Sequence, residues 1–136
     1  PRVYFFDVGI AGFLIKRGRI LPGSEAFGKA FEHFIYQEIH AHSNYSDLNY
    51  PVSYWRTVSQ TEVDFILGDH EAAIEVKATE MANARHLKGL KSFSEEYKVK
   101  RRILVSNDKH PRKTEGIDIL PWKIFLDQLW AGEIIR

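Results

Sequence analysis

The stretch that decides the fold is TEVDFIL-GDHE-AAIEVKA, residues 61–78. Apolar side chains recur at every second position of 61–67 and 72–78, which is the period of a strand with one packed face. Between these two segments, Gly68 to Glu71 carry a turn signal. The stretch therefore predicts an antiparallel hairpin.

The hydrophobic pattern also sets the register of this hairpin. Directly opposed residues of an antiparallel pair share a face, so the two apolar sets must be paired with each other. A two-residue loop at 69–70 achieves this and sets Asp64 opposite Glu75, with Cβ atoms about 4.5–5.5 Å apart. Lys77 then lies beside Glu75 and across from Glu62. One face of the hairpin is packed, and the other gathers three carboxylates and an ammonium.

Like charges directly opposite each other destabilise a sheet, and a cation between them would remove the repulsion. Hard divalent cations such as Mg²⁺ take oxygen ligands, often from one or two carboxylates plus water and phosphate. The hairpin is therefore a candidate site for a hard divalent cation such as Mg²⁺. A solvent-exposed face with Glu–Lys cross-strand pairs explains the pattern equally well, and the hairpin alone leaves both interpretations open.

The segments around the hairpin predict an α/β domain. Ser24 is expected to cap a helix that runs to about His42. Further strands are expected at 52–57, 102–106 and 117–120, and further helices at 84–97, capped by Asn83, and after Pro121. The step from the second hairpin strand through the helix at 84–97 to the next strand predicts a parallel crossover, so the central sheet should be mixed.

Two acids of the first helix lie on or beside its broad apolar face. Glu38 continues the stripe of Phe31 and Phe34, and Glu32 lies in the adjacent stripe with Ile35. Carboxylates are seldom packed against apolar surface. Both acids are therefore candidate functional residues.

Composition fits one folded domain. The chain has 136 residues, 44% of them hydrophobic, and no cysteine, which argues against disorder and excludes disulfides and thiolate metal sites. The formal net charge of +1 conceals an uneven distribution: residues 62–80 carry a net charge of −5 and residues 98–113 a net charge of +6. The first segment suits cations and the second suits phosphates.

The ends of the chain suggest a piece of a longer protein. The chain begins at Pro1, and its single methionine is Met81. Residues 1–22 are expected to be an arm or linker, and 23–136 the folded domain. No apolar run approaches the roughly 18 residues that cross a bilayer, and no secretory signal precedes the domain. The expected location is therefore the cytoplasm, without a membrane partner.

Asp64 is followed, after ten residues, by Glu75-x-Lys77, and a helix with Gly28-x-x-x-Glu32 precedes both. In this order the residues resemble the PD-(D/E)xK nuclease-like superfamily, which includes restriction endonucleases and archaeal Holliday junction resolvases. Val63 stands where that superfamily often has proline. The resemblance implies a restriction-endonuclease-like αβββαβ core, with a mixed central sheet flanked by helices.

A second resemblance covers most of the chain. The segments that carry it are Tyr4–Gly9, Phe31–Ile35, Tyr54–Thr57, Glu62–Phe65, Ile74–Lys77, Leu87–Phe93 and Leu120–Trp122. In this order they resemble the uncharacterised C-terminal domain of bacterial and archaeal AAA-type ATPases. The resemblance implies an ATPase module upstream on the same polypeptide. The chain itself has no Gly-x-x-x-x-Gly-Lys-[Ser/Thr] loop, so nucleotide binding is not expected in it.

The nuclease resemblance also implies a role for each site residue. Asp64 and Glu75 would ligate Mg²⁺ or Mn²⁺, and Glu32 would complete the ligand set or hold a metal-bound water. Lys77 would orient the attacking water or stabilise charge on the phosphate. Glu38 competes with Glu32 for the helix role, and the Gly-x-x-x-Glu match favours Glu32.

These roles imply metal-dependent hydrolysis of DNA phosphodiesters. The alternative is a catalytically inactive module that binds DNA or protein, or that regulates and assembles the ATPase, with a homo-oligomer as the corresponding assembly. Basic residues that would hold the DNA backbone in either case are Lys88, Lys91, Arg101, Arg102, Lys109, Arg112 and Lys113. An ordinary solvated surface explains these bases equally well.

Overall fold

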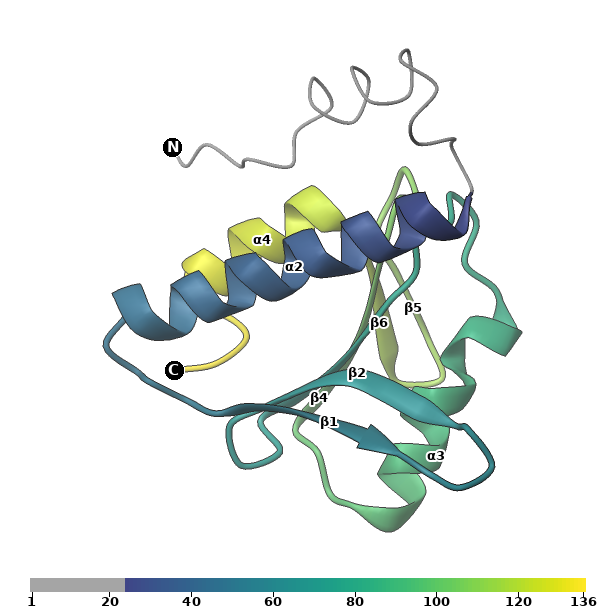
Figure 1. Cartoon of the computed structure of the whole chain (residues 1–136), viewed down its shortest axis with the longest axis horizontal. Coiled ribbons are helices and arrows are strands. Elements are labelled where there is room, and N and C mark those ends of the chain that lie inside the picture. Colours follow the sequence, from purple (N-terminus) through teal and green to yellow (C-terminus); the bar gives the residue numbers. More distant parts are fainter. Residues whose placement is uncertain (1–23) are drawn as a thin grey trace.

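The computed structural model describes residues 24–136, and the expected arm at 1–22 lies outside this part of the chain. Its elements, labelled as in Figure 1, are α2 (Glu25–Tyr45), β1 (Val52–Arg56), β2 (Glu62–Leu67), β3 (Ala72–Val76), the 3-10 turn η1 (Ala84–Leu87), α3 (Lys88–Glu96), β4 (Arg101–Ser106), β5 (Arg112–Thr114), β6 (Ile117–Pro121) and α4 (Trp122–Trp130). The predicted elements are all present, and β5 is additional.

The strands form one six-stranded sheet in the order β1-β2-β3-β4-β6-β5. The pairs β1–β2, β2–β3 and β5–β6 are antiparallel, whereas β3–β4 and β4–β6 are parallel. The mixed α/β architecture predicted from the sequence is confirmed, including the parallel step from β3 through α3 to β4.

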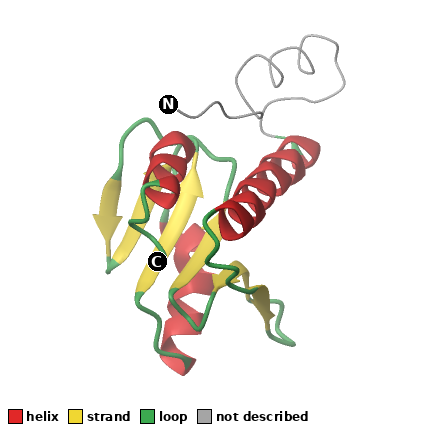
Figure 2. Cartoon of the chain, turned by 90° about the vertical axis from the view of Figure 1, so that its left-hand side faces the viewer, coloured by secondary structure: helices red, strands yellow, loops and turns green. Residues whose placement is uncertain are grey.

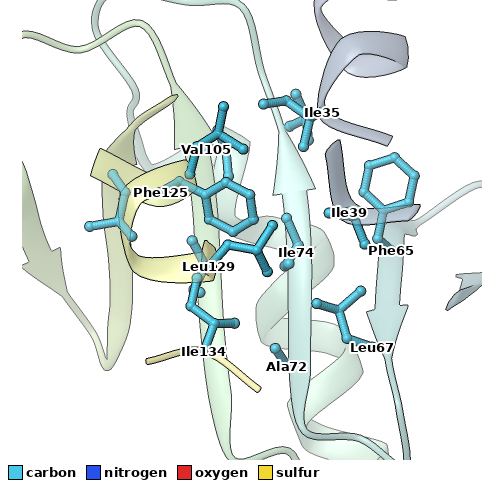
Figure 3. Close-up of a cluster of buried hydrophobic side chains, with 14 of the residues drawn as sticks. Ile35, Ile39, Phe65, Leu67, Ala72, Ile74, Val105, Phe125, Leu129 and Ile134 are labelled. Atoms are coloured by element: carbon cyan, nitrogen blue, oxygen red, sulfur yellow. The ribbon is translucent and has the colours of Figure 1, made fainter. Parts of the chain in front are cut away.

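Helices cover both faces of the sheet. Helices α2 and α4 pack on one face, and α3 packs on the other (Figure 2). Figure 3 shows the larger core, in which Ile39 of α2 and Leu129 of α4 lie over Ile74 of β3. All five residues of β3 are buried. Of the two interpretations of the charged face, the solvent-exposed one therefore does not hold for β3, because α3 covers the face opposite α2 and α4.

Local capping explains where the helices begin. The Ser24 side chain accepts a hydrogen bond from the Phe27 N–H at 3.1 Å, as predicted, and α2 continues to Tyr45 rather than to about His42. Asn83 Oδ1 accepts from the Arg85 N–H at 3.1 Å, so the predicted cap is present here too, although η1 precedes α3. No helix between residues 24 and 136 combines the length and the apolarity that a membrane-spanning segment needs.

A β-bulge divides β2 at Asp64. Ser53 of β1 is opposite Ile66, but Trp55 is opposite Val63, so two residues of β2, at 64 and 65, face Tyr54 alone. The extra residue changes the face on which the side chains lie. Val63 packs with the core under α3, whereas Phe65 joins the core under α2 and α4, although they are two positions apart.

The missed strand, β5, has the sequence Arg-Lys-Thr and is the sheet edge beyond β6. Its first two residues are exposed, so it carries no apolar alternation to reveal it. The basic stretch 98–113 is accordingly not one arm. It is divided between the loop before β4, β4 itself, the loop after it and β5.

Gly89→Ala should lower the free energy of unfolding by about 2 kcal/mol. A Cβ at this position would collide with the backbone carbonyl oxygen of Glu62, so α3 would have to move away from β2. The higher helix propensity of alanine recovers only part of this loss. Urea denaturation measures the effect.

Gly28→Ala in α2 is the matched control, because a Cβ there meets no atom within 4 Å. Alanine should raise the free energy of unfolding by about 0.5–1 kcal/mol at this position. Equal stabilisation by both substitutions would contradict the close approach of α3 to β2.

Candidate active site

The site forms where β2 and β3 part. Phe65 pairs with Ile74 and Leu67 with Ala72, which is the predicted register and sets Asp64 opposite Glu75. At this pair, hydrogen bonds from backbone N–H groups to side-chain carboxylates take the place of backbone–backbone hydrogen bonds between the strands. The Asp64 N–H donates to Glu75 Oε1 at 3.1 Å, and the Val76 N–H donates to Asp64 Oδ2 at 2.8 Å. Each carboxylate thus bonds to the backbone of the opposite strand.

Glu75 is only 4% exposed. It lies on the α3 side of the sheet, where its Oε2 would be 3.7 Å from a Cβ at Gly89. Lys77 is the nearest cation, with Nζ 3.8 Å from Glu75 Oε2 and a side chain that is 41% exposed. The Lys77 N–H donates to the carbonyl of Val105 in β4 at 2.9 Å. The parallel neighbour therefore holds Lys77 in line with β3 after β2 has turned away.

Two of the acids are difficult to ionise. Burial raises the pKa of Glu75 well above the ordinary carboxyl range, and the hydrogen bond with the Asp64 side chain and the charge of Asp64 raise it further. Burial also raises the pKa of Glu32 on α2, with additional contributions from the charges of Asp64 and Glu62. The nearby Lys77 opposes both shifts. The acids therefore form one interacting group with insufficient positive charge.

A pocket of about 380 Å³ opens beside this group. Its walls come from α2, β1 and β2, and its lining residues are Glu32, Tyr54, Trp55, Arg56, Glu62, Val63 and Asp64. Arg56 Nη2 of β1 is 3.1 Å from Glu62 Oε2 of β2, so Glu62 forms its ion pair with the neighbouring strand β1. The expectation that Glu62 faces Lys77 is not met.

The two candidate helix acids have different surroundings. Glu38 is 4% exposed and accepts from Trp130 Nε1 of α4 at 3.3 Å, so it lies in the α2–α4 contact. Glu32 lies on the pocket wall, where Asp64 affects its pKa. The structure therefore brings Glu32, and not Glu38, to Asp64.

The carboxylates supply the oxygen ligands that Mg²⁺ and Mn²⁺ prefer. The raised pKa values of Glu32 and Glu75 are what closely spaced acids show when only one ammonium compensates them. Across residues 24–136, however, no group of three or more His, Asp or Glu side chains is placed to hold a metal ion. The two carboxylates of Asp64 and Glu75 could hold a hard cation that takes only one or two carboxylates and completes its coordination shell with water.

Most of the predicted phosphate-binding bases are engaged inside the protein. Arg101 bonds to Asp118 and Gln128, Arg102 to Ser94 and Glu115, and Arg112 to Asp108, while Lys113 pairs with Asp118 and Lys91 with Glu115. Lys88 and Lys109 are exposed. Arg101, Arg102, Arg112 and Lys113 therefore have partners within the protein, whereas Lys109 is an exposed base of the same stretch.

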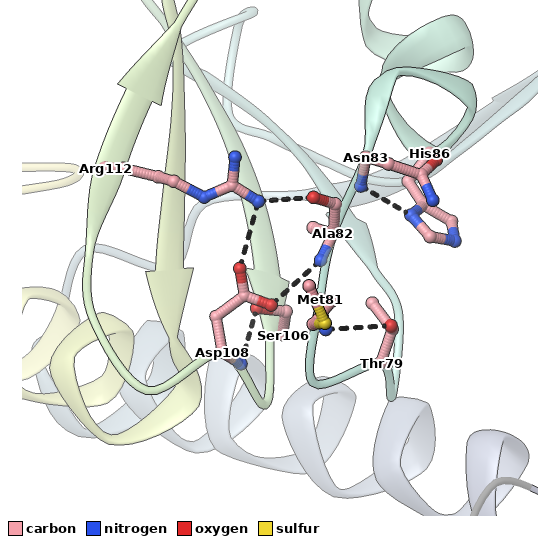
Figure 4. Close-up of polar contacts among 8 residues, drawn as sticks. All are labelled: Thr79, Met81, Ala82, Asn83, His86, Ser106, Asp108 and Arg112. Atoms are coloured by element: carbon pink, nitrogen blue, oxygen red, sulfur yellow. Dashed lines mark hydrogen bonds and ion pairs between the residues drawn. The ribbon is translucent and has the colours of Figure 1, made fainter.

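Asp108 organises the loop that follows Lys77 (Figure 4). This carboxylate is 8% exposed, accepts from the Ala82 N–H at 3.0 Å and pairs with Arg112 at 3.2 Å. Arg112 also donates to the Ala82 carbonyl. Sequence reasoning did not identify this clamp, although Asp108 is the only acid in the basic stretch 98–113, which is a signal for an internal ion pair.

Comparisons with known proteins give one finding. A protein-family model described as a domain of unknown function, DUF4143, matches residues 27–125. Neither a search of curated proteins nor a search of solved structures returned a match. The matched range includes α2 except its first two residues, the whole hairpin and every residue of the pocket.

Glu75→Gln should stabilise the metal-free chain by about 2 kcal/mol near pH 8 and give little gain near pH 4. A carboxyl whose pKa is raised on folding contributes stability that is fully present below the ordinary value of 4.5. That contribution is lost as the pH rises toward the raised value. Glutamine retains an acceptor for the Asp64 N–H without the charge. Urea denaturation in buffer with a chelator measures the difference.

Glu96→Gln is the control, because Glu96 is exposed at the end of α3. It should leave the pH dependence unchanged. An equal loss of stability in Glu75→Gln at both pH values would contradict the raised pKa.

Proposed function

We propose that this chain, which belongs to the DUF4143 family, is a nuclease-like domain that hydrolyses DNA phosphodiesters with Mg²⁺ or Mn²⁺. Members of this family are in general C-terminal domains of AAA-ATPase-like proteins. The observation that carries this proposal is the junction of Asp64 and Glu75 where β2 and β3 part, with Glu32 and Lys77 beside it. The ATPase activity would belong to an upstream module.

The topology supports the nuclease-like part of the proposal. The order α2, β1, β2, β3, α3, β4 corresponds to an αβββαβ core, with an antiparallel meander followed by a parallel strand. In this order Asp64 falls on the second strand, and Glu75 and Lys77 fall on and just after the third. This is the arrangement that the resemblance implies.

Each residue has a role that its position allows. Asp64 and Glu75 would hold the metal ion, each with one oxygen already bonded to the opposite strand. When bound, such an ion acidifies a water molecule and neutralises charge on the phosphate. Glu32 on the pocket wall would hold and orient a water molecule. The partly exposed ammonium of Lys77 would stabilise negative charge on the phosphate.

The start of α3 is the surface best placed to hold the DNA backbone. Arg85 and Lys88 are exposed there, and with Lys91 they line a hollow of about 440 Å³. His86, between them, has a pKa lowered by burial first and then by the charges of Arg85 and Lys77. His86 is therefore within the electrostatic reach of both Arg85 and Lys77. Phosphates bound here would lead toward the site.

The second candidate function is a catalytically inactive module for binding DNA or protein and for regulating or assembling the ATPase. The same two carboxylates favour it, because they satisfy the backbone N–H groups of Asp64 and Val76. Acids that complete the end of a strand pair have a structural role even without a metal. Nuclease activity and metal binding separate the two functions.

Asp64→Asn should reduce cleavage to less than about one hundredth of the original rate. Asparagine keeps an acceptor for the Val76 N–H but removes a charged metal ligand, so the fold should persist. Cleavage of supercoiled, linear and branched DNA in Mg²⁺ or Mn²⁺ is measured, together with binding of the metal alone by calorimetry.

Glu96→Gln is again the control and should cleave at the original rate. Cleavage that survives Asp64→Asn would refute the site. A chain that binds neither ion and cuts no substrate would support the inactive module instead.

Replacing both Arg85 and Lys88 with Gln should weaken DNA binding to a similar extent for all sequences, and should reduce the slope of log affinity against log salt by about 2. Lys123→Gln is the control, because Lys123 is exposed on α4, over the opposite face of the sheet. An unchanged salt slope in the double variant, measured by fluorescence anisotropy, would exclude this surface.

A further inference from the structure

We infer that Tyr54 is a stacking platform for an unpaired base, so that the substrate of the site is a nucleic-acid strand with unpaired bases. The inference rests on the proposed function, and it adds to that function the class of substrate. It is carried by the position of Tyr54, its exposure and the charges around it.

The bulge in β2 positions Tyr54 beside the site. Because two residues of β2 face this one residue of β1, the side chains of Tyr54 and Asp64 are cross-strand neighbours. Both line the 380 Å³ pocket. The phenol ring is therefore adjacent to a carboxylate that would hold the metal.

The neighbouring side chains show which face Tyr54 occupies. Trp55 packs against Phe93 of α3, with ring centres 5.4 Å apart and planes at 74°. Alternation along the strand then places Tyr54 and Arg56 on the opposite face, which is the face of α2 and Glu32. Tyr54 is 72% exposed. Since β1 is an edge strand, the ring is accessible from solvent.

The charges favour a base rather than a phosphate as the group bound at this wall. The Arg56 guanidinium carbon is 5.8 Å from the centre of the Tyr54 ring, and its charge is paired with Glu62 at 3.1 Å. The wall is thus neutral and aromatic, with acids of the pocket beside it. A phosphate would be repelled by those acids, whereas an uncharged base gains stacking and dispersion contacts.

Stacking on Tyr54 requires a base that has left its own stack. Bases within a duplex expose only their edges, and a base reaches a protein ring by extrusion or from a single strand. The adjacent pocket falls within the usual size range of sites for small organic groups, about 300–1,000 Å³. The geometry therefore fits single strands, flaps or frayed ends.

The test uses 2-aminopurine, whose fluorescence reports stacking, in DNA and RNA oligonucleotides and in a DNA duplex, with the 136-residue chain in a chelator so that nothing is cut. Tyr54→Ala should weaken single-strand binding by about tenfold and abolish the fluorescence change, as expected for the loss of one stacked base. Tyr54→Phe should retain both. Tyr45→Ala is the control, because Tyr45 is 81% exposed at the far end of α2.

Each outcome decides the inference. Binding of the duplex as tight as that of the single strand, or single-strand binding unchanged in Tyr54→Ala, overturns it. The DNA and RNA arms identify the sugar that is accepted. Cleavage in Mg²⁺ is measured separately, so that the proposal of DNA hydrolysis and the proposal of base stacking on Tyr54 are tested independently. Duplex cleavage without dependence on Tyr54 overturns only the platform, and Tyr54-dependent stacking without any cleavage overturns only the hydrolysis.

Discussion

The reciprocal bonding of Asp64 and Glu75 is the interaction on which both the fold and the site depend. Each carboxylate accepts a backbone N–H from the opposite strand, at 2.8 and 3.1 Å. These bonds satisfy two donors where β2 separates from β3, and a buried donor without a partner would cost about 1–3 kcal/mol. They also hold two acids in contact inside the protein. The stability of the sheet end and the chemistry of the site therefore share the same atoms.

The bulge in β2 determines which helix layer each side chain of this strand contacts. By inserting one residue opposite Tyr54, it turns Val63 toward α3 while Phe65 stays under α2. Both faces of the strand can then be buried, and Asp64 lies at the change of face. Without the bulge, Val63, Phe65 and Leu67 would share one face, and Ile66 alone would present an apolar side chain to α3.

The sequence predicts the elements that local pattern and pairing determine. The register follows from apolar alternation, because a slip by one residue would place the apolar sets of the two strands on opposite faces of the hairpin. The bulge could not be predicted, since one extra residue in a six-residue strand leaves no compositional signal. β5 was missed because Arg112 and Lys113 follow no apolar period. The internal ion pairs of Arg101 depend on contacts distant in sequence, so its structural role could not be distinguished from a solvated one.

Burial of like charges constrains what the site can do. Glu75 is almost fully buried, and Lys77, at 3.8 Å, is the cation paired with it. A proton or a metal ion must supply the missing positive charge, because ionised acids that are this close and this buried repel each other strongly. Protons and divalent cations therefore compete for the same carboxylates. Any substrate group that approaches before a metal ion meets negative potential, and the neutral wall formed by Tyr54 and the Arg56–Glu62 pair is where an uncharged group can bind without that penalty.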